Sequence, residues 1–185
     1  MRLFVAVDLD EPARSAIVRQ QARLRTLVPG ASLRWVRPEH LHITLAFLGE
    51  VDDARVDAIV AIFAPAINQA PFELRLGGLG VFPPRGAPRT LWIESHDPQL
   101  NDLRSEIAGR LDRVGLRLDS RSFSSHVTIA RWKMSRSGDR SSLLSIQLPK
   151  PLAYVSVDHA TLYQSRLSSA GPIYTERARV NVTGT

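Results

Sequence analysis

Two segments of the chain share one pattern, a histidine followed two residues later by a threonine, with apolar residues between and after them. They read HITLA from His42 and HVTIA from His126. Apolar residues alternate with the polar pair in both, which is the period of a β-strand, where residues i and i+2 point to one face. The pattern therefore predicts two strands that carry His42 beside Thr44 and His126 beside Thr128, with the apolar side chains buried on the opposite face.

The duplication exceeds chance and points to acid–base chemistry. A chain of 185 residues with five histidines and eight threonines contains by chance roughly 0.2 His-x-Thr triplets. Imidazole, with an unperturbed pKa of about 6.5, serves as an acid or a base near neutral pH. Two imidazoles that face each other across a cleft can work in tandem, one taking a proton from water and the other giving one to a leaving oxygen. Hydroxyl and arginine side chains can hold phosphoryl oxygens in such a site.

Two plainer interpretations of the duplicated segments also have to be weighed. The histidines can be ordinary half-buried residues of two strands, or they can bind zinc. A zinc site needs at least a third protein ligand, and no third ligand recurs at a fixed spacing from His42 or His126. The matched flanks therefore favour catalysis by the pair, with no metal or other cofactor.

Composition narrows the classes of chemistry and partner. Twenty-four Lys and Arg against 18 Asp and Glu give a net charge of +6, which favours a phosphate-bearing partner, although part of the arginine excess is explained equally well by coding bias. The only lysines, Lys133 and Lys150, lie outside any glycine-rich phosphate loop or adenylation motif, which argues against nucleoside-triphosphate chemistry. The absence of cysteine excludes disulfides, thiolate metal sites and a cysteine nucleophile.

Hydrophobic patterning predicts an α+β chain with no membrane span or signal peptide, and hence a cytoplasmic protein. Helices are expected from Asp10 to before Pro29, from about residue 52 with a kink or stop at Pro65, and from Pro98 to Gly115. Residues 77–88 and 135–142 are expected to form loops. Strands are expected over 3–9, 33–36, 42–47, 72–76, 90–94, 126–131, 153–163 and 174–180.

The segments RLFVAVDL, WVRPEHLHITLAFLGEV, GLGVFPPRGAPRTLWI, SSHVTIAR and LYQSRLSSAGPIYT, in this order, cover nearly the whole chain. In them the sequence resembles the two-histidine (2H) phosphoesterases, and among these the bacterial and archaeal RNA 2′,3′-cyclic phosphodiesterases historically called 2′-5′ RNA ligases. The resemblance implies a bilobal α+β fold, with two pseudo-symmetric lobes around a central cleft. Each lobe would have an antiparallel sheet with helices outside. It also implies that residues 1–185 form a single domain of two intertwined lobes.

The resemblance also implies roles for individual residues. His42 and His126 would be the catalytic pair, with His42 as general base on water and His126 as general acid on O3′, or the reverse. Thr44 and Thr128 would bind the phosphate through their hydroxyl groups. Arg131, five residues after His126, matches an arginine of the family that contacts the phosphate or the ribose.

Phe47 stands where the family places an aromatic ring against the nucleobase, and packing in the core is an almost equal alternative. His40 departs from the family pattern, and we interpret it as a solvated residue at the entrance of the strand rather than an outer substrate contact. The remaining aromatic and histidine side chains are expected to serve packing or to lie at the surface. These are Trp35, Trp92, Trp132, Tyr163, Tyr174, His96 and His159.

The activity implied by the resemblance is metal-independent hydrolysis of a terminal 2′,3′-cyclic phosphate of RNA, or of a 2′,3′-cyclic nucleotide, to a 2′-phosphomonoester. An RNA 5′-hydroxyl in place of water would give reversible, ATP-independent 2′-5′ ligation. The alternatives are a nucleotide- or RNA-end-binding module without turnover, and an enzyme for another cyclic phosphate such as ADP-ribose 1″,2″-cyclic phosphate. We expect a monomer that has no membrane partner.

Overall fold

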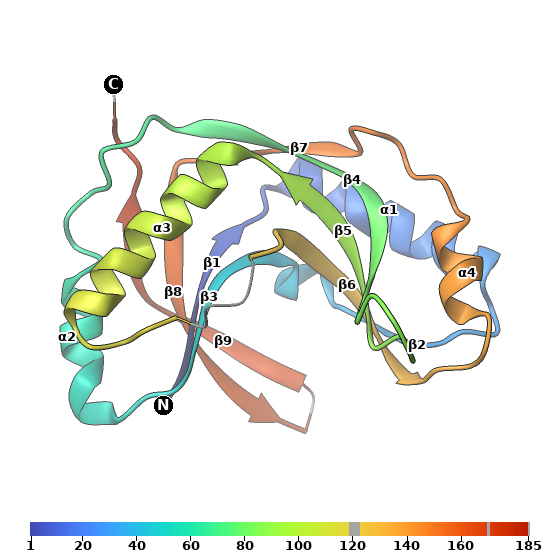
Figure 1. Ribbon diagram of the computed structural model, residues 1–185, viewed down its shortest axis with the longest axis horizontal. Coiled ribbons are helices and arrows are strands. Elements are labelled where there is room, and N and C mark those ends of the chain that lie inside the picture. The colour runs from blue at the N-terminus through green and yellow to red at the C-terminus, as the bar shows by residue number, and fades with distance from the viewer. Residues whose placement is uncertain (119–122, 170, 185) are drawn as a thin grey trace.

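The computed structural model describes residues 1–118, 123–169 and 171–184 (Figure 1). Two long helices are α1 (Glu11–Leu27) and α3 (Pro98–Arg113), and two short ones are α2 (Val56–Ala61) and α4 (Asp139–Leu144). The strands are β1 (Arg2–Asp8), β2 (Ser32–Trp35), β3 (His42–Glu50), β4 (Phe72–Phe82), β5 (Thr90–His96), β6 (His126–Met134), β7 (Ala153–Val157), β8 (His159–Ser168) and β9 (Gly171–Asn181).

Within the described residues the strands form one antiparallel sheet in the order β7-β4-β5-β6-β3-β1-β8-β9, with β2 on the far part of β6. The centre of this order is the contact between β3 and β6, which pair only through Ile43 and Val127. We call the strands β6, β5, β4, β7 and β2 the β6 side, and the strands β3, β1, β8 and β9 the β3 side. The two sides have the same arrangement, because β5-α3-β6 and β1-α1-β3 each form an antiparallel strand pair joined by a long helix.

The two long helices are exchanged between the sides. Helix α1 follows β1 of the β3 side but packs against the β6 side, and α3 follows β5 of the β6 side but packs against the β3 side. Gln21, buried on α1, donates from Nε2 to the carbonyl of Ile129 on β6, at 2.9 Å. Arg104 on α3 donates from Nε to the carbonyl of Leu45 on β3, at 3.1 Å. Each acceptor lies three residues after a motif histidine, so the two contacts are equivalent. Figure 1 shows α3 over the β3 side and α1 behind β4 and β5.

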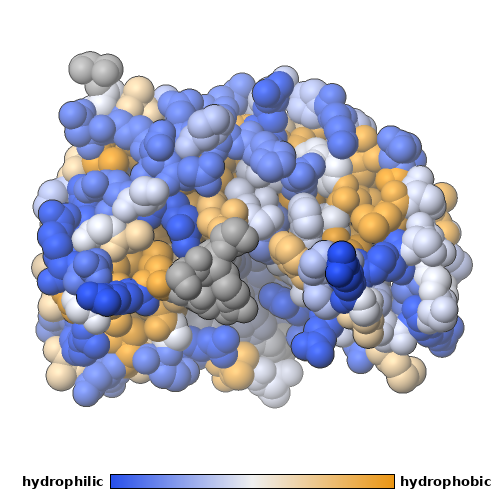
Figure 2. Space-filling model, in the orientation of Figure 1, coloured by the Kyte–Doolittle hydropathy of each residue, from blue (hydrophilic) through white to orange (hydrophobic). Residues whose placement is uncertain are grey.

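The core lies between the sheet and these helices. Ile43, Leu45, Val127 and Ile129 are buried in it, together with the apolar stripes of α1 and α3. In the described part of the chain, no helix covers the opposite face of the central strands. Figure 2 shows the molecule hollowed at its lower centre, between the two sides. The predicted bilobal α+β fold is confirmed, with the refinement that the sheets of the two lobes are joined into a single sheet through the pair Ile43 and Val127.

Both long helices begin as predicted. The Asp10 side chain accepts a hydrogen bond from the backbone of Ala13 and caps α1, and Asp97 caps α3 in the same way, with a proline in the first turn of each. Pro65 follows a helix that already ends at Ala61. None of the described helices is long and apolar enough to cross a membrane.

Three loop and strand predictions were wrong. Residues 77–82 continue β4 instead of forming a loop, because their backbone pairs with β5. The predicted strand over 153–163 is two strands, β7 and β8, which lie on opposite sides of the molecule. The predicted loop over 135–142 contains the start of α4, whose Leu143 is buried. These outcomes depend on partners distant in sequence, which local patterns do not contain.

Candidate active site

The two motif strands meet so that their polar residues share one face. Because β3 and β6 are antiparallel and Ile43 pairs with Val127, His42 lies opposite Thr128, and Thr44 lies opposite His126. Directly opposed residues of an antiparallel pair point to the same face. The pairing therefore brings both imidazoles and both hydroxyl groups together on the face without helices, as the alternation predicts.

A β-bulge in each motif strand adds a third residue to this face. On β3, Thr44 pairs with Ala6 of β1, and Ala46 pairs with the adjacent Val5. One extra residue is therefore inserted in β3, and Phe47 returns to the face of His42. On β6 the same shift lies between Thr128 and Ala130, and it returns Arg131 to the face of His126. Strict alternation would have pointed both side chains to the opposite face.

Backbone carbonyls hold both imidazoles in one tautomer. Nδ1 of His42 lies 2.8 Å from the carbonyl oxygen of His40, and Nδ1 of His126 lies 2.7 Å from that of Ser124. A carbonyl oxygen only accepts, so in each ring Nδ1 carries the hydrogen and Nε2 of the neutral ring is left as the basic atom. The hydroxyl of Thr44 donates to Nε2 of His42 at 3.1 Å. Both rings are thus oriented to exchange protons through Nε2.

Both imidazoles favour the neutral form. Burial lowers the pKa of His42 to about 4, against the opposing effects of its hydrogen bond to His40 and the charge of Asp8. Burial also lowers the pKa of His126, and the positive charge of Arg131 acts in the same direction on both rings. The Arg131 guanidinium therefore lies within electrostatic reach of the two histidines.

Aromatic rings surround His42. The ring of Phe4 lies 5.1 Å from the imidazole between centroids, and that of Tyr174 lies 5.6 Å away, edge-on. Phe4 also contacts the ring of Phe47 at 6.0 Å. Phe47 itself is 62% exposed, which contradicts the core alternative and leaves an open aromatic surface beside the histidine. His40 lies in a 3₁₀ turn just before β3, with its ring 4.9 Å from Tyr174.

A matching aromatic wall stands beside His126. The rings of Phe82 on β4 and Trp92 on β5 lie 5.1 and 5.6 Å from the imidazole, and 5.0 Å from each other. Gly80 faces Trp92 across the strand pair, and a Cβ at this position would overlap the indole ring. The glycine therefore leaves the space in which the indole packs against His126.

A polar network lies beside His42 on β1 and β8. The carboxylate of Asp8, which pairs with His42 across the strands, accepts hydrogen bonds from Thr161 at 3.0 Å and from Tyr163 at 2.8 Å. Burial raises the pKa of Asp8, but its contacts with His159, Tyr163 and Thr161 outweigh burial and leave the pKa below its usual value. The Asp8 carboxylate in turn raises the pKa of His159, whose Nε2 lies 3.8 Å away. A fixed negative charge therefore stands next to His42.

Sequence reasoning missed several residues of this site. Phe4, Asp8, Phe82, Trp92 and Tyr174 all lie within or beside it, although the sequence analysis predicts only packing roles for the tryptophan and the tyrosine. The alternation of Phe4 and Asp8 along β1 was an available signal, but it predicts a shared face only once β1 is known to pair with β3. His96, as expected, lies at the surface, where it bonds to Glu94 at 2.9 Å.

The described residues contain no group of three His, Asp or Glu side chains that could together hold a metal ion. The polar groups of the site are two imidazoles, hydroxyls, a guanidinium and one paired carboxylate. This set can bind an anion and move protons on both sides of it.

Comparison with known proteins identifies the family. A sequence model described as LigT like Phosphoesterase matches residues 7–92 and again residues 93–174. The chain belongs to the LigT-like phosphoesterase family. Each match contains one His-x-Thr segment, so the two family repeats of this LigT-like phosphoesterase correspond to the two motif strands.

Individual relatives agree with this assignment. The RNA 2′,3′-cyclic phosphodiesterase of Methanothermobacter thermautotrophicus is 32% identical over 179 residues, which cover 95% of this chain and 96% of the relative. The crystal structure of a Thermus thermophilus protein matches the LigT-like phosphoesterase with a TM-score of 0.82 and 29% identity, over 100% of this chain and 99% of that one. Escherichia coli LigT complexed with 3′-AMP matches with a TM-score of 0.77 and 28% identity, over 98% of both chains.

Proposed function

We propose that this LigT-like phosphoesterase hydrolyses the terminal 2′,3′-cyclic phosphate of RNA to a 2′-phosphomonoester, by acid–base catalysis with two histidines. The observation that carries the proposal is the pair of imidazoles on one face, each with Nδ1 bonded to a backbone carbonyl, so that Nε2 is the basic atom of each neutral ring. The relative from Methanothermobacter thermautotrophicus, which bears the name of this activity, supports the substrate class.

In the proposed reaction, Nε2 of neutral His42 takes a proton from water as the water oxygen attacks phosphorus. The bond from phosphorus to O3′ breaks, and protonated His126 gives its Nε2 proton to O3′ as that oxygen leaves. The product keeps the phosphate on O2′ and carries a free 3′-hydroxyl. One proton has entered His42 and one has left His126, so the pair returns to its starting state by exchange with solvent.

The difference in burial supports this assignment of base and acid. The pKa of about 4 keeps His42 neutral near neutral pH, as a base must be. His126 is less deeply buried, and the negative charge of a bound phosphate stabilises its protonated form, which takes its proton from solvent. A substrate with sulfur in place of O3′ tests the assignment, because a thiolate leaves without a proton. His126→Ala would then keep activity on the sulfur substrate and His42→Ala would not, whereas the reverse result would exchange the two roles.

The remaining site residues are proposed to bind the substrate. The hydroxyls of Thr44 and Thr128 and the guanidinium of Arg131 would hold the non-bridging phosphoryl oxygens and stabilise the charge that grows on them in the transition state. Phe47, exposed beside the Phe4 ring, would stack on the terminal base. Stacking tolerates different bases and suits single-stranded ends.

Product analysis on an oligoribonucleotide with a 2′,3′-cyclic end tests the function. We expect a 2′-phosphate product, resistance to a chelator, and loss of about 10²- to 10⁴-fold in activity for His42→Ala or His126→Ala. Circular dichroism of each variant checks that the fold is retained. Full activity in either variant refutes the two-histidine mechanism, a 3′-phosphate product refutes O3′ as the leaving atom, and inactivation by chelator shows that a metal takes part.

Residues 1–185 are further proposed to form a single domain of two intertwined lobes, located in the cytoplasm and monomeric. The exchange of the long helices between the two sides, through Gln21 and Arg104, supports the domain assignment. Neither side then has a complete core alone. A single unfolding transition by calorimetry and a sedimentation mass of one chain are the expected results, and two transitions or a larger mass would contradict them.

A further inference from the structure

The positive charge of the chain is concentrated in two segments at one end of the β6 side. Residues 83–89 join β4 to β5, and residues 131–141 run from the end of β6 into α4. Together they contain six basic residues and a single carboxylate, that of Asp139, so they hold a net +5 of the +6 charge of the whole chain. The basic residues are Arg85, Arg89, Arg131, Lys133, Arg136 and Arg140.

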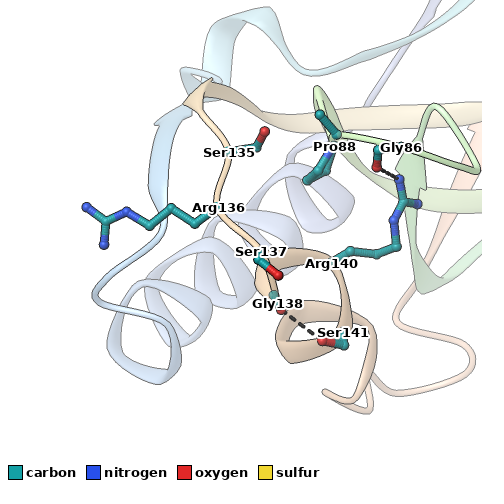
Figure 3. Close-up of a pocket in the computed structure, with 9 residues that line it drawn as sticks. Gly86, Pro88, Ser135, Arg136, Ser137, Gly138, Arg140 and Ser141 are labelled. Atoms are coloured by element: carbon teal, nitrogen blue, oxygen red, sulfur yellow. Dashed lines mark hydrogen bonds between the residues drawn. The ribbon is translucent and has the colours of Figure 1, made fainter.

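A pocket of about 440 Å³ lies between these two segments. Residues 86–88 form one wall, and residues 135–138 with Arg140 and Ser141 form the other. Figure 3 shows Ser135 and Ser137 on the pocket side of their loop, whereas the Arg136 side chain points away from it. The guanidinium of Arg140 reaches across to the opposite wall. The lining thus offers hydroxyl groups and a cation, and no acidic side chain of the described residues lines it.

Hydrogen bonds hold the two walls in place. Nη2 of Arg140 donates to the carbonyl oxygens of Pro83 at 2.7 Å and Gly86 at 2.9 Å, and so ties α4 to the β4–β5 loop. The Asp139 carboxylate accepts from the Trp132 indole at 3.0 Å and from the backbone of Arg136 at 2.9 Å. The one carboxylate of the region is therefore used to shape the loop, and the pocket is formed before any ligand arrives.

The pocket lies beyond the ends of β5 and β6 that carry Thr90 and Arg131. Arg131 pairs with Thr90 across β5 and β6, and its guanidinium lies 3.4 Å from the Thr90 hydroxyl. Pro88 precedes Thr90 by two residues, and Ser135 follows Arg131 by four, which is about 13 Å along an extended chain. Arg34 on β2, exposed and opposite Arg131, adds a second cation to the site face on this path.

We propose that this pocket binds a backbone phosphate of the RNA strand, upstream of the nucleotide that carries the cyclic phosphate. The proposal rests on the function proposed above. A set of cations between Arg131 and a preformed pocket with serine hydroxyls matches the charge and the acceptor oxygens of a phosphodiester backbone. The pocket thus distinguishes RNA chains from mononucleotides, both of which fit the catalytic histidines.

The experiment compares adenosine 2′,3′-cyclic phosphate with a hexanucleotide that ends in the same cyclic adenosine. Ser137→Asp places a negative charge in the pocket, and Ser137→Asn places a neutral side chain of the same size there. Ser105→Asp, on the exposed surface of α3, is the control for the change in net charge.

We expect Ser137→Asp to raise KM for the hexanucleotide about tenfold, the size of one charge-assisted contact, and to leave KM for the cyclic nucleotide unchanged. Ser137→Asn and Ser105→Asp should behave as the wild type on both substrates. Equal KM changes on both substrates, an equal effect of Asn and Asp, or no effect of Asp would each overturn the pocket proposal. If the wild type hydrolyses neither substrate, it is the proposed function that fails.

Discussion

Acidification should destabilise the protein through His42 even before the carboxylates are protonated. Burial lowers the pKa of this imidazole to about 4 in the folded state, whereas an unfolded histidine has a pKa of about 6.5. Between these two pH values the His42 side chain is protonated in the unfolded chain and neutral in the folded one. The contribution of neutral His42 to the free energy of unfolding is therefore fully present above about pH 6.5 and decreases as the pH falls toward 4.

The size of the effect follows from the two pKa values. At about pH 5 the unfolded imidazole is almost fully protonated and the folded one is about one-tenth protonated, so proton linkage lowers the free energy of unfolding by about 2 kcal/mol relative to pH 7. That is a large part of the stability of a typical domain. His42→Gln removes the titrating group and keeps a polar side chain of similar length, so this variant should lose about 2 kcal/mol less over the same pH interval.

Urea unfolding of both proteins at about pH 7 and pH 5 measures the difference, because other titrating groups such as Asp8 and His159 are common to both and cancel. Titration of the His42 ring by NMR in the folded protein gives the midpoint directly. The reasoning is refuted if wild type and His42→Gln lose the same stability on acidification, or if the His42 ring titrates near pH 6.5.

Three further predictions concern the site and its support. Arg131→Gln removes a charge that lowers the pKa of His126. An acid–base pair gives a bell-shaped profile of kcat/KM against pH, and we expect its alkaline limb to move to higher pH in this variant, with kcat/KM itself at least about tenfold lower. An alkaline limb at the wild-type pH would show that the charge of Arg131 does not act on His126. Gly80→Ala should displace Trp92, lower the free energy of unfolding by about 1–3 kcal/mol and reduce kcat, and a crystal structure with the indole in place would contradict this. Arg110→Met leaves three backbone carbonyls without their donor and should lower the free energy of unfolding in urea by about 2–4 kcal/mol. An unchanged urea midpoint would show that these hydrogen bonds do not stabilise the fold.

Much of the site could be predicted from the sequence because its chemistry is local. A histidine and a threonine two residues apart share a face in any strand, so the pairs at His42 and His126 follow from alternation alone. The starts of α1 and α3 are similarly local, since an aspartate cap and a first-turn proline act within a single turn.

The surroundings of the histidines required the tertiary structure. The bulges that return Phe47 and Arg131 to the site face arise from strand pairing, and alternation predicts the wrong face for both. The aromatic rings beside His42 come from β1 and β9, which are distant in sequence. These rings lower the pKa of the His42 imidazole because they bury it. Burial depends on the assembled site and cannot be read from a local sequence pattern.

The sequence by itself therefore determined the two His-x-Thr pairs, the class of fold and the family, because these depend on residue types at short spacing. The tertiary structure alone decided where the charge lies. The sequence showed a net +6 and favoured a phosphate-bearing partner, and only the packing of the β4–β5 loop against α4 brought together the two segments that carry most of that charge, on either side of one pocket. The physical reason is that charges separated in sequence act together only when backbone pairing and side-chain hydrogen bonds hold them at close range.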